Sequence, residues 1–214
     1  MFLYYITDRT QLAADEDTRR RRLLEKIAAA ARSGVDLVQL REKDLAAREL
    51  ESLACQAVHV IHENSGSAAA RTRLLINSRA DVAISVGADG VHLRGDDVAV
   101  QEVREVWTRR ATSSPVISVS CHTPGEVARA LSQGADFAVF APVFEKQGSS
   151  AATTAGLGAL REVCQYRIPV LALGGVTLAN VRDCVNAGAK GIAAIRLFQE
   201  NDIAGVVASL RSPR

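Results

Sequence analysis

Short apolar runs alternate along the whole chain with longer segments in which apolar residues recur every three or four positions. Short runs are typical of buried strands, and the longer spacing is typical of amphipathic helices. The runs predict eight strands: 3–7, 74–77, 116–120, 169–173, and one shortly after each of Gly34, Gly87, Gly134 and Gly188. The segments between them predict eight helices near 17–33, 45–63, 79–86, 98–110, 124–133, 156–166, 177–187 and 200–210.

Four of these strands follow the same short pattern of a glycine, a small residue, a polar residue and an apolar run. The pattern recurs roughly every 50 residues, as expected for an architecture of repeated units. A glycine at this point suits the left-handed conformation that ends a helix, and the apolar run suits a buried parallel strand.

Eight alternating strand–helix units predict an α/β fold, and four repeats of two units favour a closed TIM barrel, (β/α)₈. An open doubly wound sheet is the alternative. The 214 residues leave little room beyond such a barrel, so we expect one domain over 1–214. Asp97, Thr123 and Thr177 stand where helix N-caps belong, and Pro124 suits the first helical position.

Composition and charge exclude several classes of protein. The chain has 26 basic and 24 acidic residues, and a net charge of +2 gives no general field for nucleic acid or membranes. No stretch approaches the ~18–20 apolar residues that span a bilayer. Four scattered cysteines without a Cys-x-x-Cys pair argue against structural zinc and suit reduced thiols. We therefore expect a cytoplasmic protein that acts on small molecules and has no nucleic-acid or membrane partner; a homodimer is left open.

In a barrel of this kind the active site lies at the carboxyl ends of the strands. Polar residues gather at those predicted positions, and the opposite ends offer no comparable concentration. The set comprises Thr7, Asp8, Gln39, Arg41, Lys43, Asn77, Ser78, Arg79, His92, Asp96, Asp97, Ser120, His122, Gly174, Gly175 and Arg196.

Two parts of this set suit phosphate groups. Gln39, Arg41 and Lys43 share one alternating face, and two cations with an amide donor suit a phosphate or diphosphate. Pairing of these charges at the barrel rim is the alternative. Gly174-Gly175 leads into a predicted helix, so bare backbone amides can cradle a phosphate there. A simple tight turn is the alternative for the glycines.

The remaining candidates concern a metal, a proton and one more cation. Asp96 and Asp97 can hold Mg²⁺, which takes few carboxylates and keeps water and phosphate oxygens; helix capping is the alternative. His122 is the best general acid/base candidate, because imidazole exchanges a proton near neutral pH. Arg196 could contact the phosphate at the glycines or pair with an acid. The role of His92 is left open.

Five segments carry a family resemblance when they are taken in order: LYYITD (3–8), QLREKD (39–44), LLINSRADVAISVGADGVHL (74–93), SVSCHT (118–123) and ALGGVT (172–177). Together they resemble the thiamine phosphate synthase/TenI family over essentially the whole chain. The resemblance implies a transferase that joins 4-amino-2-methyl-5-hydroxymethylpyrimidine diphosphate to hydroxyethylthiazole phosphate and releases diphosphate, with Mg²⁺ as cofactor.

The resemblance also implies roles for individual residues. Gln39, Arg41, Lys43 and Asn77 match ligands of the diphosphate, and Ser120 matches a residue near it. Asp97 matches a magnesium ligand, and Gly174 and Gly175 match the cradle of the thiazole phosphate.

The sequence departs from the family pattern at three places. The Asn-Asp pair after the third strand is Asn77-Ser78, so one magnesium carboxylate is missing. The Thr-x-Thr-Lys loop after the sixth strand corresponds to FEKQGSS at 144–150, and the serine after the eighth strand is Arg196. Asp96 and Lys146 lie near enough in sequence to compensate.

These departures leave other functions open. The departures after the third and sixth strands favour a TenI-like thiazole tautomerase, which moves a proton on thiazole phosphate carboxylate and would use His122. Gln39, Asp97 and the LYYITD segment favour the synthase, which we place first. A non-catalytic regulatory barrel that binds thiazole phosphate, or an isomerase of phosphorylated sugars on the same fold, are further hypotheses.

Overall fold

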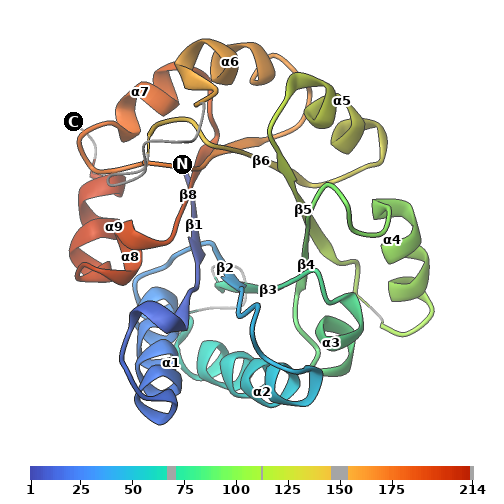
Figure 1. The fold of residues 1–214 in the computed structure, drawn as a ribbon, viewed down its shortest axis with the longest axis vertical. Coiled ribbons are helices and arrows are strands. Elements are labelled where there is room, and N and C mark those ends of the chain that lie inside the picture. Colours follow the sequence, from blue (N-terminus) through green and yellow to red (C-terminus); the bar gives the residue numbers. More distant parts are fainter. Residues whose placement is uncertain (67–70, 112, 146–153, 213–214) are drawn as a thin grey trace. The chain divides into compact units, whose positions relative to one another are not determined.

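The computed structural model describes residues 1–66, 71–111, 113–145 and 154–212. Its strands follow one another in chain order around a closed barrel, and every pairing with an assigned register is parallel (Figure 1). The strands are β1 (Phe2–Ile6), β2 (Leu37–Leu40), β3 (Arg73–Asn77), β4 (Gly90–Leu93), β5 (Val116–Cys121), β6 (Phe137–Phe140), β7 (Val170–Ala172) and β8 (Gly191–Ala194). The predicted (β/α)₈ fold is therefore confirmed, and the open sheet is excluded.

Helices follow the strands, and a short 3₁₀ turn, η1 (Arg9–Gln11), comes directly after β1. Within the described part of the chain they are α1 (Glu16–Arg32), α2 (Ala47–Asn64), α3 (Ala80–Ser85), α4 (Val100–Thr108), α5 (Pro124–Ser132), α6 (Gly156–Val163), α7 (Val181–Asn186), α8 (Arg196–Gln199) and α9 (Ile203–Arg211). The helix expected at 200–210 corresponds to α9, and a separate short helix, α8, precedes it. None of the described helices has the length and apolar character of a membrane span.

The helix starts test the predicted N-caps. Thr123 is confirmed, because its hydroxyl accepts from Glu126 N (3.3 Å) and the Glu126 carboxylate accepts from Thr123 N (3.2 Å). Asp97 and Thr177 are wrong as N-caps, since α4 begins only at Val100 and α7 only at Val181. A local capping motif cannot distinguish a helix start from a turn that precedes the helix.

The repeated glycine pattern ends helices as predicted. Gly34 follows α1 with φ +74°, and Val35 N reaches back to Ala30 O (3.0 Å), so the chain turns sharply into β2. A left-handed glycine with this backward hydrogen bond is a common way to end a helix. The other glycines of the pattern, Gly87, Gly134 and Gly188, also have positive φ.

By packing, the chain forms two compact units. One comprises Met1–Leu3 and His92–Ala194, and the other comprises Tyr4–Val91 and Ile195–Arg214. The expectation of one domain over 1–214 stays a prediction.

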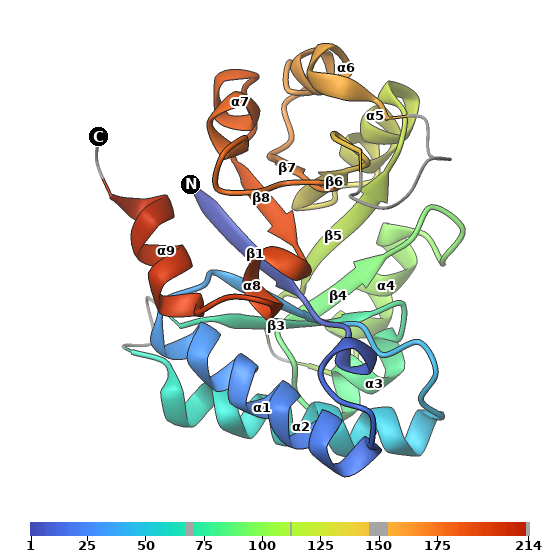
Figure 2. The same cartoon turned by 60° about the vertical axis from the view of Figure 1, so that its left-hand side comes forward.

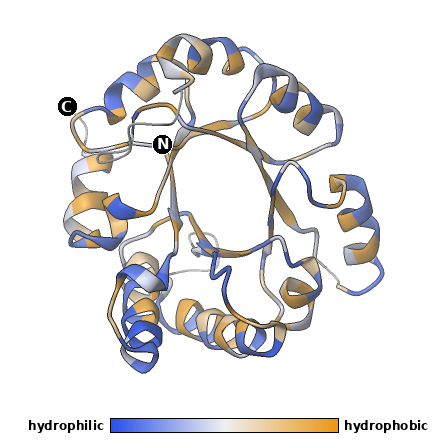
Figure 3. Ribbon diagram, viewed as in Figure 1, coloured by the Kyte–Doolittle hydropathy of each residue, from blue (hydrophilic) through white to orange (hydrophobic). Residues whose placement is uncertain are grey.

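Apolar residues concentrate on the strands and along one face of the helices (Figure 3). In the second unit α1 and α2 lie side by side (Figures 1 and 2), with Leu23, Ile27 and Leu53 fully buried. In the first unit Trp107 and Phe140 are buried. This burial of apolar surface is the main stabilising contribution to each core.

Candidate active site

The ends of β1, β2 and β3 bring one group of predicted residues together. In the register of β2 and β3, Leu40 lies opposite Ile76, so Arg41 and Asn77 are the next residues on neighbouring strands. Thr7 N donates to Gln39 O (3.0 Å), which places the end of β1 beside the same segment. Arg41 and Asn77, two of the predicted diphosphate ligands, therefore lie next to each other at the carboxyl ends of neighbouring strands.

Residues of the Gln-x-Arg-x-Lys segment differ in their exposure. Gln39 is 1% exposed, and its Nε2 donates to Tyr4 Oη (3.0 Å), so that amide nitrogen is engaged in the interior. Arg41 is half-buried and Lys43 is exposed. The two cations are thus the members of this set that are accessible to an anion from solvent.

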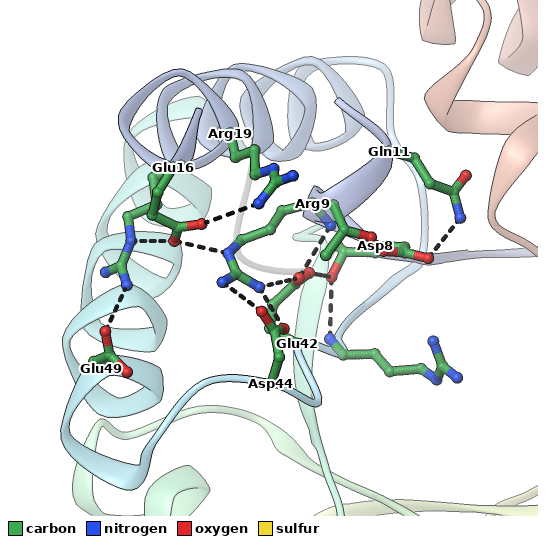
Figure 4. A network of polar contacts seen from close by, with 12 residues as sticks. Asp8, Arg9, Gln11, Glu16, Arg19, Glu42, Asp44 and Glu49 are labelled. Atoms are coloured by element: carbon green, nitrogen blue, oxygen red, sulfur yellow. Dashed lines mark hydrogen bonds and ion pairs between the residues drawn. The ribbon is translucent and has the colours of Figure 1, made fainter. Parts of the chain in front are cut away.

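Sequence reasoning missed a buried ion-pair network between the ends of β1 and β2 (Figure 4). Arg9 and Glu42 have side chains only 3% and 1% exposed, and Arg9 NH1 lies 3.2 Å from Glu42 Oε2. Arg9 also contacts Asp44 and Glu16, at 2.7 and 2.9 Å. The alternation of basic and acidic residues at 41–44 is the sequence signal that could have pointed to it.

The carboxyl groups of this network respond differently to their surroundings. Burial raises the pKa of Glu42, although hydrogen bonds from Thr7 and Arg9 act against this shift. Hydrogen bonds from Arg9 hold the pKa of Asp44 and of Glu16 below the usual range. We assign all three as charged at neutral pH, because each faces the Arg9 guanidinium.

After β3 the chain makes a tight turn at the position of the missing carboxylate. Ser78 has φ +60°, Arg79 N donates to Asn77 O (2.8 Å), and Asn77 Nδ2 donates to Ser78 Oγ (3.1 Å). The left-handed region costs a residue other than glycine about 1 kcal/mol or more. Arg79 forms two hydrogen bonds to Asp81, at 2.8 and 2.6 Å, and so is engaged at the start of α3.

The helix that carries Arg196 is tied to the end of β1. Gln199 Oε1 accepts from Tyr5 Oη and from Asp8 N (both 3.1 Å), and Gln199 Nε2 donates to Asp8 O (2.8 Å). Arg196, the first residue of α8, is exposed. The structure thus places this cation in solvent, directly after β8.

In the other unit, His92 links two serines of β5. Its Nδ1 lies 2.8 Å from Ser118 Oγ, and its Nε2 lies 2.8 Å from Ser120 Oγ. His92 is 4% exposed, whereas Ser120 is half-buried. The imidazole therefore orients the hydroxyl of Ser120, the residue that the resemblance places near the diphosphate.

His122 is exposed at the end of β5, and its ring orientation is set by a backbone carbonyl. Its Nδ1 lies 2.7 Å from Ala141 O. A carbonyl oxygen only accepts, so Nδ1 carries a proton and Nε2 is the basic nitrogen of the neutral ring. This tautomer suits a group that takes a proton at Nε2.

Asp96 and Asp97 lie in the turn after β4 and both face Arg94. Asp97 Oδ2 accepts from Arg94 N (2.7 Å), and Arg94 NH2 lies 3.3 Å from Asp96 and 3.4 Å from Asp97. Among the described residues no three metal-binding side chains form a cluster. The donor chemistry nevertheless fits Mg²⁺, which binds through one or two carboxylates and takes its other ligands from water and phosphate.

Gly174 and Gly175 are required where the chain passes close to the segment after β6. Their φ values are +96° and +63°. A Cβ at 174 would lie 2.8 Å from Pro142 Cα, and one at 175 would lie 2.5 Å from Glu145 O. The helix N-terminus that was expected to follow these glycines lies further along the chain, because α7 starts only at Val181. Asn180 instead supports the loop, since its Nδ2 donates to Gly175 O (3.0 Å).

The loop after β6 and the cysteine thiols are two further features to consider at the candidate site. Lys146 and most of the loop at 144–150 lie outside the described residues. All four cysteines are free thiols, and burial raises the pKa of Cys121 to about 12, so this neighbour of His122 is a poor nucleophile.

Comparisons with known proteins show which family this chain resembles. A family model described as thiamine monophosphate synthase matches residues 3–198. A putative thiamine-phosphate synthase of Geobacter sulfurreducens is 41% identical over 195 residues, covering 90% of this chain and 84% of that protein. The thiamine-phosphate synthase of Methanoculleus marisnigri is 36% identical over 212 residues, covering 98% and 93%.

A solved structure supports the same relationship. Thiamine phosphate pyrophosphorylase from Pyrococcus furiosus aligns with a TM-score of 0.78 and 27% identity, covering 98% of this chain and 93% of that one. Because the family model matches from β1 to α8 and the relatives are similar over nearly their full length, the chain belongs to the thiamine monophosphate synthase family.

Proposed function

We propose that this protein is a thiamine-phosphate synthase, a transferase that joins 4-amino-2-methyl-5-hydroxymethylpyrimidine diphosphate to hydroxyethylthiazole phosphate. The observation that carries the proposal is the carboxyl end of β2 and β3, where half-buried Arg41 follows β2 beside Asn77 and exposed Lys43 lies two residues further along the chain, in a protein similar to named synthases. In the reaction the bond from the pyrimidine methylene to the diphosphate oxygen breaks, and the thiazole nitrogen bonds to that carbon.

Arg41 and Lys43 would bind the diphosphate and stabilise the charge that grows on it as the bond breaks. Preorganised cations at the site of developing charge are commonly the largest catalytic contribution. Asn77 would donate from its amide, and Ser120, oriented by His92, would donate its hydroxyl. In this scheme the side chains bind and orient the substrate, and none becomes covalently attached.

Asp97, with Asp96, would hold a magnesium ion. When bound, that ion would neutralise part of the diphosphate charge. The Arg94 guanidinium faces both carboxylates, so it must move or share them when the metal binds. Ser78 offers a hydroxyl where the family has a carboxylate, which leaves fewer anionic ligands for the metal.

The loop at Gly174 and Gly175 would hold the phosphate of the thiazole. Absence of side chains there lets the backbone approach a ligand closely. Arg196 is a second candidate for the same phosphate.

The tautomerase is the second candidate function, because one specific observation favours it. The hydrogen bond from His122 Nδ1 to Ala141 O leaves Nε2 as a base in the neutral ring. A tautomerase needs such a proton carrier, whereas a synthase depends mainly on charge at the diphosphate. A non-catalytic barrel would bind thiazole phosphate and perform neither reaction.

Two substitutions distinguish these functions, with purified protein supplied with thiazole phosphate, pyrimidine diphosphate and Mg²⁺. For a synthase, Lys43→Ala should reduce thiamine phosphate formation more than His122→Ala does. For a tautomerase, His122→Ala should lose roughly 10²–10⁴-fold on thiazole phosphate carboxylate while Lys43→Ala stays active. Tight binding of thiazole phosphate without either turnover would support the non-catalytic barrel.

The proposal also includes a cytoplasmic location and small phosphorylated molecules as substrates, with neither nucleic acid nor membrane involved. The four free thiols support a reducing compartment. The open question of a homodimer is answered by light scattering of the purified protein.

A further inference from the structure

We propose that Glu42, with Thr7 and Arg9, is a positioning residue that holds the diphosphate-binding segment 41–44 in place. This inference rests on the proposed function, since it takes Arg41 and Lys43 as ligands of the diphosphate. Glu42 lies between these two cations in the sequence, yet its side chain is only 1% exposed whereas Lys43 is exposed. It therefore acts through its neighbours and does not touch substrate.

The first contact fixes the backbone of Arg41. Thr7 Oγ1 donates to Glu42 Oε1 (2.5 Å), and the same oxygen accepts from Arg41 N (3.0 Å). Because the Thr7 hydroxyl donates its hydrogen bond to Glu42, the lone pairs of Thr7 Oγ1 are available to accept from the Arg41 amide. The carboxylate thus determines the orientation of a hydroxyl that holds the first cation.

The second contact joins the segment to the turn after β1. Glu42 Oε2 accepts from Arg9 N (3.0 Å) and from Arg9 NH1 (3.2 Å), and Asp44 accepts two hydrogen bonds from the same guanidinium (2.7 and 2.9 Å). Figure 4 shows both acids converging on Arg9. The segment is therefore held at residues 41, 42 and 44, on either side of Lys43.

The network also arranges the charges of the segment. Residues 41–44 alternate basic and acidic, and both acids pair with Arg9. Their negative charge, which would repel a diphosphate, is compensated by a cation that is itself buried. Arg41 and Lys43 then provide the positive charge of this segment toward an anionic ligand.

A role in stability alone is a weak explanation for this pair. Burying two charges carries a desolvation penalty that their attraction often does no more than offset, and replacing both partners by apolar residues frequently leaves a protein as stable. Through the Thr7 hydroxyl, Glu42 supports the backbone amide of Arg41, a proposed ligand. Through Arg9, it is linked to Asp44, which follows Lys43, the other proposed ligand. The geometry is that of a support behind a binding site. Behind metal ligands, removing such a supporting group typically lowers affinity or activity about 10–100-fold.

The test measures binding of inorganic diphosphate in MgCl₂ and of thiazole phosphate by calorimetry. Glu42→Met removes the acceptor oxygens at similar volume and leaves Arg9 with Asp44 and Glu16. We expect it to weaken diphosphate binding about 10-fold or more while thiazole phosphate affinity stays close to wild type; the melting temperature should fall, because Arg9 N and the Thr7 hydroxyl lose a buried acceptor. Glu42→Gln retains one acceptor oxygen and should regain most of the diphosphate affinity.

Two further variants keep the test decisive. Glu16→Gln is the matched control, because it removes another acid from Arg9 without touching segment 41–44, and it should bind diphosphate like wild type. Thr7→Val removes only the hydroxyl that bridges Glu42 and Arg41 N, and it should lose diphosphate affinity even if Glu42→Met does not fold.

The outcomes separate this inference from the proposed function. Wild-type diphosphate affinity in Glu42→Met or in Thr7→Val, or an equal loss for both ligands, would overturn the inference alone. If the wild-type protein itself binds no diphosphate, the proposed function falls and the inference falls with it.

Discussion

At the scale of single residues, Asp97 has two roles. Its carboxylate forms a structural hydrogen bond in the turn after β4, and it is also the proposed metal ligand. Its Oδ2 accepts from Arg94 N at 2.7 Å, and its side chain is only 12% exposed. Asp96, by contrast, is 75% exposed and contacts only the Arg94 guanidinium among the described contacts. The two carboxylates therefore differ in how firmly they are held, although they are adjacent in sequence.

Asp97→Asn tests the metal role without removing the turn. The amide oxygen still accepts from Arg94 N, so the melting temperature should change little, but the charge that attracts Mg²⁺ is lost. We expect the Mg²⁺ concentration for half-maximal synthesis of thiamine phosphate to rise about tenfold or more. Asp96→Asn should raise it less. Unchanged magnesium dependence in Asp97→Asn would remove this residue from the metal site.

His92 shows how a residue acquires a role from its neighbours. A lone histidine near a strand end has no assigned partner in the sequence, but here both ring nitrogens face serine hydroxyls of β5. One nitrogen of a neutral imidazole donates and the other accepts, so the ring couples the orientations of Ser118 and Ser120.

At the scale of elements, the loop after β7 is shaped by its approach to the segment after β6. Val143 N donates to Leu173 O (2.9 Å) and Phe144 N donates to Gly174 O (3.0 Å), so the two loops run together. Side chains at 174 or 175 would push them apart. The glycines are therefore required for packing, in addition to any contact with phosphate.

Gly174→Ala and Gly34→Ala form a matched pair that separates strain from crowding. Both positions have positive φ, but a Cβ at 34 meets nothing within 4 Å whereas one at 174 meets Pro142 at 2.8 Å. We expect Gly34→Ala to lose about 1 kcal/mol of unfolding free energy and Gly174→Ala about 2 kcal/mol or more.

Only Gly174→Ala should also weaken thiazole phosphate binding in calorimetry. Urea denaturation measures the two stability losses. If both variants bind thiazole phosphate like the wild type, the loop is structural and the phosphate site lies elsewhere.

At the scale of the whole molecule, the ion pairs make stability depend on pH. Arg9 lowers the pKa of Asp44 and Glu16, and Arg79 lowers that of Asp81. A carboxyl group with a lowered pKa stabilises the fold above its ordinary value, and this contribution is lost as pH falls through the folded pKa. Glu42 acts in the opposite sense, because burial raises its pKa.

With the N-cap Asp15, four carboxyl groups of the described residues have a lowered pKa and only Glu42 has a raised one, which predicts a net loss of stability below about pH 4. Urea denaturation at pH 7 and at pH 3 should show a smaller unfolding free energy at the lower pH. Asp44→Asn should reduce that difference. A free energy that does not change between the two pH values would contradict the assignment of these ion pairs.

Structural features that depend on short-range patterns could be predicted from the sequence. The alternation of apolar runs with helical spacing, and the glycines that end helices, predicted the strands, most helices and the closed barrel. These features depend on contacts within a few residues and on the rule that parallel strands need helical crossovers. The closed barrel also predicted that Arg41, Lys43 and Asn77 would gather at the carboxyl ends of the strands. The register pairs Leu40 with Ile76, so Arg41 and Asn77 are next on neighbouring strands, and the place of Lys43 beside them stays a prediction.

Features that depend on distant residues were decided only by the tertiary structure. Nothing near Arg9 in the sequence shows that it pairs with Glu42 and Asp44, and nothing near Gln39 shows that its amide bonds to Tyr4. The need for glycine at 174 and 175 likewise depends on the close approach of Pro142 and Glu145 after β6. The physical reason is the same in each case: a side chain's partner, and hence its exposure and charge, is set by which chain segments the barrel brings side by side.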